Sequence, residues 1–202
     1  MTFSFQLTGG RCCNANEWLS HWERKYPSEK YDEKKYDYLI RRAGVLSSED
    51  FILLGRWKDA AWSEKKWRPN VAMVAFPAWM DVSKELPGFR IEQTSPEEFL
   101  NKWSERLYPD TSSRRPDGKK HFGLPRATTL LHFISAGKFP IYDSRVRTAV
   151  RRLCNKRALD DVEWYLNSYI PIFDQLVNVC GASVRSLDKA LHAYGGRSVK
   201  TA

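Results

Sequence analysis

The sequence predicts an all-α protein, and three observations support this prediction. Apolar residues recur at helical spacing along most of the chain, residues that favour helix N-caps precede these stretches, and glycine or proline follows them. No internal repeat is visible, which excludes a solenoid or a propeller. We therefore expect residues 1–202 to form a single helical domain, because a chain of this length can bury a sizeable core.

The first part of the chain contains three expected helices and one ambiguous segment. Helices are predicted over 16–26 and over 31–43, the second of which ends at Gly44. Residues 47–50, Ser-Ser-Glu-Asp, are a start signal for a third helix. Residues 71–76 fit a short buried strand and a helical turn equally well, since six residues are too few to distinguish the two.

Two strong helix signals follow, with a polar segment between them. Residues 95–98, Ser-Pro-Glu-Glu, combine an N-cap, a proline at the first helical position and a capping-box acid, and they predict a helix to about residue 108. The segment 109–120 is rich in turn-forming residues and cations, so we expect a loop that is either solvated or in contact with phosphates. Pro125 and Gly137 then bracket another helix.

The next helix has an apolar side flanked by cations. Pro140 prevents the preceding helix from continuing, so residues 138–142 are expected to form an extended connector that leads to Asp143 at an N-cap position. The apolar side comprises Val146, Ala149, Val150, Leu153 and Cys154. The flanking cations are Arg145, Arg147, Arg151, Arg152 and Lys156. Three further helices are expected over 160–168, 171–180 and 184–194.

The composition favours a nucleic-acid partner. The chain has 33 Lys+Arg against 24 Asp+Glu, a net charge of +9, together with 8 Trp, 9 Tyr and 10 Phe. Such a composition is typical of nucleic-acid binding, although the charge could serve solubility alone. No apolar run approaches the ~18 residues of a membrane span, and the N-terminus has no signal-peptide pattern. The four unevenly spaced cysteines predict neither disulfides nor a metal knuckle, which favours the cytoplasm.

Residues 123–128, Gly-Leu-Pro-Arg-Ala-Thr, are followed by a helix and then by residues 139–147, Phe-Pro-Ile-Tyr-Asp-Ser-Arg-Val-Arg. This succession resembles the signature of the helix-hairpin-helix DNA glycosylase superfamily, in particular its adenine-mismatch and 8-oxoguanine branches. The resemblance implies a helix-hairpin-helix fold with a cleft between two helical lobes. We expect residues 1–94 to form an N-terminal lobe, for which the sequence shows no family resemblance, and residues 95–202 to carry the hairpin and the aspartate.

The resemblance also implies that Asp143 is the catalytic carboxylate. Cleavage of an N-glycosidic bond develops positive charge on the sugar, and a carboxylate stabilises that charge and orients or deprotonates water. An N-cap position favours the ionised carboxylate through backbone N–H donors and the helix dipole. The alternative is that Asp143 only caps its helix, and the two roles are compatible.

The sequence departs from the family pattern at two positions of the hairpin. Ala127 occupies the place where bifunctional members carry a Schiff-base lysine, which predicts base excision without strand cleavage; Lys138 or another lysine is the alternative nucleophile. Pro125 replaces the usual second glycine and lacks an N–H, which puts the hairpin's metal-assisted grip on phosphate in doubt. The cysteine spacing of iron–sulfur members is absent, and no metal or cofactor is expected.

Further candidate residues follow from the chemistry of DNA. Phosphate contacts are expected from Gly123, Leu124, Arg126, Lys119, Lys120, Arg145 and Arg147. A flipped base needs flat surfaces to stack on, and the candidates are Trp57, Trp62, Trp67, Trp79 and Tyr142. Tyr142 is favoured because it adjoins Asp143, whereas His132 is expected to be a core histidine and not a base.

These observations predict a monomeric, monofunctional DNA glycosylase that removes a modified or damaged base from double-stranded DNA. Base excision repair and defence against phage DNA with modified bases are both compatible with the sequence. One rival is a non-catalytic DNA-binding protein that uses the hairpin only to hold the backbone. Another is a helical interaction protein whose basicity is incidental, which the salt dependence of DNA binding would distinguish.

Overall fold

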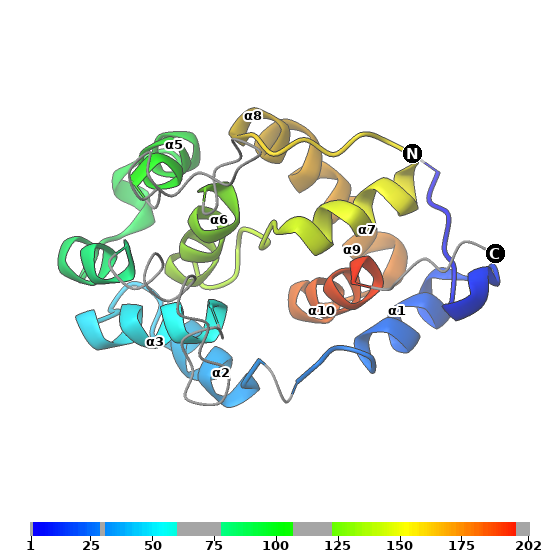
Figure 1. The fold of residues 1–202 in the computed structure, drawn as a ribbon, viewed down its shortest axis with the longest axis horizontal. Helices are drawn as coiled ribbons and strands as arrows, with labels where there is room; N and C mark the ends of the chain where they lie inside the picture. Colours follow the sequence, from blue (N-terminus) through cyan, green and yellow to red (C-terminus); the bar gives the residue numbers. More distant parts are fainter. Residues whose placement is uncertain (1, 29–30, 60–77, 107–122, 197–202) are drawn as a thin grey trace, which may run out of the picture. The chain divides into compact units, whose positions relative to one another are not determined.

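The structure, a computed structural model, describes residues 2–28, 31–59, 78–106 and 123–196 (Figure 1). The helices are α1 (Ala15–Glu23), α2 (Glu33–Arg41), α3 (Ser48–Lys58), α5 (Pro96–Arg106), α6 (Gly123–Ile134), α7 (Ser144–Cys154), α8 (Val162–Trp164), the π-helical η5 (Tyr165–Tyr169), α9 (Ile170–Cys180) and α10 (Val184–Gly195), with 3₁₀ turns η1 (Thr8–Gly10) and η3 (Ile91–Gln93). Residues 78–85 are also helical. Over the described residues the one β-type pairing is an isolated bridge between Gln6 and Cys12, so the all-α prediction is confirmed there.

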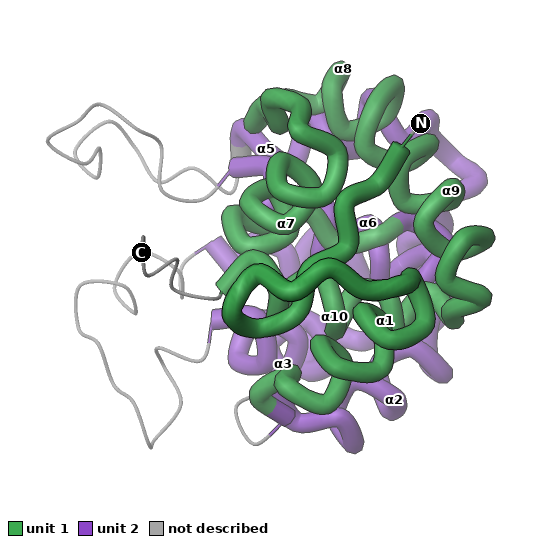
Figure 2. Tube along the Cα trace, turned by 90° about the vertical axis from the view of Figure 1, so that its right-hand side faces the viewer, with its two compact units in different colours: residues 1–27, 140–202 green, residues 28–139 purple. Residues whose placement is uncertain are grey.

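The chain divides into two compact units (Figure 2). Unit 1 combines residues 1–27 with residues 140–202, and unit 2 consists of residues 28–139. The first residues of the chain therefore pack with its last third. The backbone N–H of Ser4, for example, donates to the carbonyl of Leu153 at 2.8 Å, at the C-terminal end of α7.

Unit 2 contains α2, α3, α5 and α6, and α3 and α5 begin where the sequence predicts. Ser47 caps α3 in a capping box with Asp50, and the Ser95 hydroxyl accepts from the backbone N–H of Glu98 in the first turn of α5. Helix α6 packs against α5 and α2, and nearly every residue of α6 is buried. It begins at Gly123, two residues before the predicted start at Pro125.

Unit 1 contains α1 and the elements from α7 to α10. Helix α10 packs against both α7 and α1, and the predicted apolar side of α7 is buried at Val146, Ala149, Val150 and Leu153. Trp18 and Trp22 of α1 lie edge-on to the ring of Tyr194 of α10, with ring centroids 5.5 and 5.2 Å apart. The core of unit 1 is therefore aromatic as well as aliphatic.

The prediction of separate helices over 160–168 and 171–180 is wrong. The structure has helical backbone without a break from Val162 to Cys180, and its middle turn, η5, is a π-helix. Pro171 has no backbone N–H to donate to an α-helical turn. The turn that precedes it is a wide π turn, in which the N–H of Ile170 donates to the carbonyl of Tyr165. This turn lets the helix continue through the proline.

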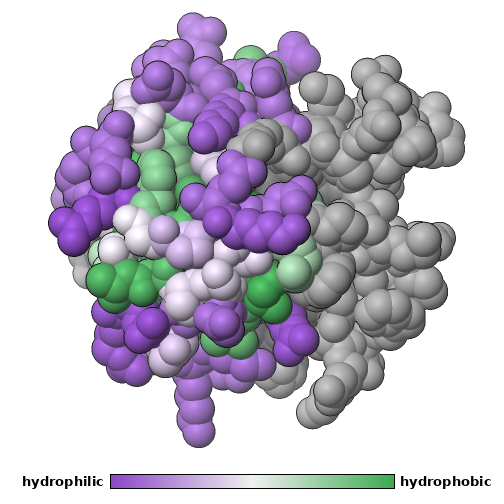
Figure 3. Space-filling model, turned by 90° about the vertical axis from the view of Figure 1, so that its left-hand side faces the viewer, coloured by the Kyte–Doolittle hydropathy of each residue, from purple (hydrophilic) through white to green (hydrophobic). Residues whose placement is uncertain are grey.

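The side of the molecule on which α2, α3 and α5 lie is predominantly hydrophilic, with small separate hydrophobic areas (Figure 3). None of the described helices combines the length and the apolar composition that a membrane span requires. The ambiguous segment 71–76 and the polar segment 109–120 lie outside the described residues.

Candidate active site around Asp143

Asp143 is the N-cap of α7, as the sequence predicts. Its backbone is extended (φ −112°, ψ 179°), and its Oδ1 accepts hydrogen bonds from the backbone N–H groups of Arg145 at 2.9 Å and Val146 at 3.0 Å. The residue is half-buried, and the two hydrogen bonds hold its Oδ1 in place. Both donors belong to the first turn of α7, at the positive end of its helix dipole.

The connector that leads to Asp143 is held through three successive carbonyls. Within unit 2, Nδ1 of buried His132 donates to the carbonyl of Phe139 at 2.7 Å. Within unit 1, the Tyr165 hydroxyl donates to the carbonyl of Pro140 at 2.8 Å, and the Tyr169 hydroxyl donates to the carbonyl of Ile141 at 3.1 Å. A carbonyl can only accept, so these bonds place the hydrogens on His132 Nδ1 and on both hydroxyls.

Tyr142, Tyr165 and Tyr169 form a compact group, which we call the tyrosine cluster. The Tyr142 ring lies 4.5 Å from the Tyr169 ring and 5.7 Å from the Tyr165 ring, and all three residues have an exposed fraction of 0%. Burial raises the pKa of each of the three phenols well above the usual range, so the hydroxyls remain protonated donors. The cluster fixes the backbone immediately before Asp143.

The stacking role expected of Tyr142 needs correction. Its ring is covered by Tyr169 and by Trp164, whose ring is stacked on it at 5.5 Å, and its hydroxyl donates to the carbonyl of Leu159 at 2.7 Å. Tyr142 is therefore a core residue of unit 1, with no free face for a base. The signal that the sequence interpretation missed is the spacing of Tyr165 and Tyr169, four residues apart and thus on one helix face.

The tryptophan candidates in unit 2 are also core residues. Trp57 packs edge-on against Phe133 with ring centroids 5.3 Å apart, and its exposed fraction is 6%. Trp79 is fully buried, and its indole N–H donates to Asp59 at 2.8 Å. Trp62 and Trp67 lie outside the described residues. Neither of the two candidate tryptophans that the structure describes thus offers a stacking surface for a base.

Arg126 does not face solvent, contrary to its expected role as a phosphate contact. Its exposed fraction is 6%, and its guanidinium makes two charged hydrogen bonds to the Asp59 carboxylate, both at 2.7 Å. Gly123 and Leu124 are buried in the first turn of α6, so their side of the helix is not open to a DNA backbone. Lys119 and Lys120 lie outside the described residues.

Helix α7 carries four arginines within nine residues of Asp143 in the chain. Arg145 is half-buried, and within the described part of the protein its side chain has no hydrogen bond or ion pair. Arg147 pairs with Asp160 at 2.6 Å, and Arg151 is exposed. The guanidinium of Arg152 donates to the carbonyl of Tyr194 at 2.9 Å and thereby ties α7 to α10.

The first turn of α7 also makes a close backbone contact with the end of α10. A Cβ on Gly195 would lie 1.8 Å from the carbonyl oxygen of Arg145, whereas a Cβ on Gly196 would first meet the side-chain nitrogen of Arg145 at 3.1 Å. Only a glycine fits at position 195. Helix α10 therefore supports the same turn whose N–H groups bind Asp143.

The position of the family's Schiff-base lysine and the alternative lysine have different environments. Ala127 is fully buried in α6, and Lys138 is exposed after the turn in which Gly137 adopts a φ of +83°. His132 is a core histidine, as expected, with its Nε2 2.8 Å from the Tyr36 hydroxyl. No cluster of three or more metal-ligating side chains occurs among the described residues.

Comparison with known proteins identified no matching family model, no matching curated protein and no matching solved structure.

Proposed function

We propose that this protein is a monofunctional DNA glycosylase that hydrolyses the N-glycosidic bond of a modified or damaged base. The observation that carries the proposal is the geometry of Asp143. Two backbone N–H groups bind its side chain, and the connector that precedes it is held by hydrogen bonds from two buried tyrosines to its carbonyls. A catalytic carboxylate needs such a fixed position, because electrostatic stabilisation is largest when the group is preorganised. The resemblance of residues 139–147 to the glycosylase superfamily supports the same reaction.

In the proposed reaction, the bond between C1′ of the sugar and the nitrogen of the base breaks, and the base takes the bonding electrons. The Asp143 carboxylate stabilises the resulting positive charge on the sugar. A water molecule then forms a bond from its oxygen to C1′, and its proton passes to Asp143 and finally to the departed base. The products are the free base and an abasic site in an intact strand.

The phosphate contacts of this proposal differ from those expected from the sequence alone. Arg145 and Arg151 are the proposed contacts, because one lacks a protein partner among the described residues and the other is exposed. Arg147 would contribute by exchanging Asp160 for a phosphate. Arg126 is left out because Asp59 already binds its guanidinium in a buried pair.

The chain offers a matched control for a test of Asp143. Asp32 is also an N-cap whose Oδ1 accepts from the N–H groups two and three residues later, Lys34 and Lys35, but it lies at the start of α2 in unit 2. Because Asn caps a helix about as well as Asp, both Asp143→Asn and Asp32→Asn should remain folded. Losing the transition-state charge partner should reduce excision by about two to four orders of magnitude in Asp143→Asn alone.

The assay incubates each variant with bacterial and phage DNAs that carry different base modifications, and mass spectrometry identifies the released bases. The product strands should break only after alkali, and borohydride should trap no covalent protein–DNA adduct. Excision at the wild-type rate by folded Asp143→Asn would refute the mechanism. DNA binding without release of any base from the whole panel would favour the non-catalytic binding protein instead.

A further inference from the structure

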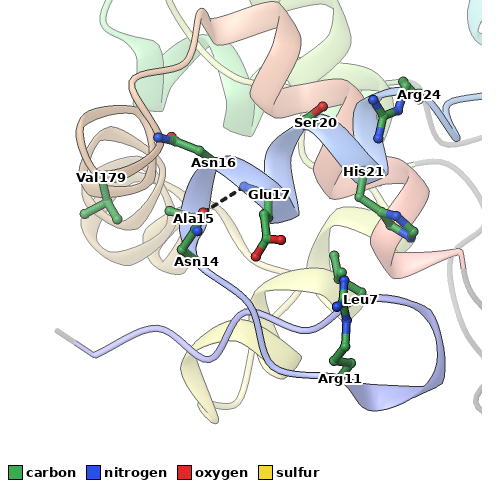
Figure 4. Close-up of a pocket in the computed structure, with 10 residues that line it drawn as sticks. All are labelled: Leu7, Arg11, Asn14, Ala15, Asn16, Glu17, Ser20, His21, Arg24 and Val179. Atoms are coloured by element: carbon green, nitrogen blue, oxygen red, sulfur yellow. Dashed lines mark hydrogen bonds between the residues drawn. The ribbon is translucent and has the colours of Figure 1, made fainter.

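A cavity of about 720 Å³ lies in unit 1, between the segment 7–14 and one side of α1 (Figure 4). Its lining residues are Leu7, Arg11, Asn14, Ala15, Asn16, Glu17, Ser20, His21, Arg24 and Val179. Cavities of this size hold small organic ligands. None of the lining residues belongs to the connector or to the tyrosine cluster, so the cavity is a separate feature from the candidate active site.

The charged groups of the cavity are predominantly cationic. Arg11 and Arg24 are exposed, and neither side chain has a hydrogen bond or an ion pair within the described residues. In the view of Figure 4, His21 lies between these two arginines and Glu17 lies to one side of them. Glu17 is the one carboxylate among the lining residues, so two permanent cations face a single anion.

His21 is held in place by a short hydrogen-bonded chain. The Lys25 ammonium donates to the Thr8 hydroxyl at 2.6 Å, and that hydroxyl lies 3.0 Å from Nε2 of His21. Since Lys25 can only donate, the Thr8 hydroxyl accepts from it and can direct its own hydrogen to Nε2. His21 then carries its N–H on Nδ1, where it can serve a ligand.

Three cations surround His21, and they set the sign of the local potential. Burial, and next the positive charges of Lys25, Arg24 and Arg11, lower the pKa of His21 below its usual range. The field is therefore positive at the imidazole, and it would attract an anion.

The uncharged polar groups of the cavity provide further donors. Oδ1 of Asn14 accepts from the backbone N–H of Glu17 at 2.9 Å, which leaves the amide NH₂ of Asn14 to donate. Asn16 and Ser20 contribute an exposed amide and an exposed hydroxyl. A ligand that satisfies these groups must carry several acceptor oxygens and negative charge, and a phosphate group has both.

We propose that this cavity binds a phosphate group, with Arg11 and Arg24 as its charged donors, His21 as an oriented neutral donor, and Glu17 as a group that limits the affinity. The source of the phosphate is either a free nucleotide or the backbone of a nucleic acid, since both present the same oxygens. The proposal is independent of base excision, because it concerns binding alone at residues away from Asp143.

The test measures binding of three probes by calorimetry: inorganic phosphate, deoxyadenosine monophosphate and a 12-base-pair duplex. Arg11→Gln and Arg24→Gln should each weaken binding roughly tenfold, as expected when a charged hydrogen-bond donor is removed. Glu17→Gln should strengthen binding about threefold to tenfold, since it removes the opposing charge. Arg56→Gln is the matched control, because Arg56 is an exposed arginine of α3 in unit 2 and its loss changes the net charge equally.

The pattern of effects decides the outcome. If all three probes bind and respond to the cavity variants, the site accepts free phosphate compounds; if only the duplex responds, the phosphate is that of a nucleic-acid backbone. As an independent readout, NMR titration of His21 should show its pKa rising when the responding probe is bound. If neither arginine variant changes the affinity for any probe beyond the effect of Arg56→Gln, the proposal is overturned.

Discussion

The hold of the tyrosine cluster on the connector leads to a sharp prediction about Tyr169. Tyr169→Phe removes the hydroxyl that donates to the carbonyl of Ile141 and keeps the shape of the ring. Ile141 has an exposed fraction of 3%, so water cannot readily replace the lost donor. Leaving a buried carbonyl without its hydrogen bond costs about 1–3 kcal/mol of unfolding free energy. For a chain of 202 residues this corresponds to a fall in Tm of roughly 2–12 °C.

The same variant should affect catalysis if the connector positions Asp143. Excision should slow by about 10- to 100-fold in kcat with little change in KM for DNA, because a displacement of the carboxylate impairs the transition state and not the binding of phosphates. Tyr165→Phe, which frees the carbonyl of Pro140, should behave similarly.

Tyr26→Phe is the control for this prediction. The Tyr26 hydroxyl accepts from the guanidinium of Arg185 at 3.1 Å, in unit 1 but away from the connector, so its loss should lower Tm and leave kcat unchanged. Thermal unfolding and single-turnover excision are measured on all three variants. A Tyr169→Phe protein with the Tm of the wild type would refute the hydrogen-bond argument, and one with reduced Tm but the wild-type kcat would show that the cluster does not position Asp143.

Two further predictions concern stability. Because burial raises the pKa of all three phenols of the tyrosine cluster, their contribution to stability is complete below the unfolded-state pKa of about 10 and is lost as the pH rises above it. The unfolded chain then releases three protons that the folded chain retains, so the unfolding free energy should fall by about 4 kcal/mol per pH unit. In Tyr142→Phe, which lacks one of the three phenols, this fall should be about one third smaller. Urea unfolding between pH 9 and 12 measures both slopes. Gly195→Ala should destabilise the protein by roughly 1–3 kcal/mol or more, because its Cβ would lie 1.8 Å from the backbone oxygen of Arg145. Gly196→Ala should cost much less, because its Cβ would meet the Arg145 guanidinium at 3.1 Å and the His192 carbonyl oxygen at 3.3 Å. Equal Tm values for the two variants would contradict the packing of α10 on α7.

The helix starts could be predicted from the sequence because capping is a local interaction. Ser47, Ser95 and Asp143 each accept from a backbone N–H no more than three residues away, so the spacing of residue types along the chain contains the whole arrangement. The same reasoning could not foresee the continuous helix through Pro171, since the π turn that accommodates the proline is not a feature of residue spacing. The position of the catalytic candidate was therefore predictable, and the shape of the helix that supports it was not.

The aromatic and basic candidates show the limit of sequence interpretation more clearly. A tyrosine beside a catalytic aspartate is equally compatible with a stacking surface and with a core, and only the packing of Trp164 and Tyr169 on Tyr142 distinguishes the two. The sequence predicted that Arg126 contacts phosphate. In the structure it is paired with Asp59, and this partner could not be predicted because it is 67 residues away in the chain.

The sequence by itself determined the all-α class, most helix starts and the N-cap position of Asp143, because these depend on contacts within one or two helical turns. Only the tertiary structure decided which segments pack into each unit, which rings are buried, and which side chains hold the connector. The physical reason is range: hydrogen bonds such as that from Tyr165 to Pro140 join residues 25 apart, and the pairing of such residues depends on how the whole chain buries its apolar surface.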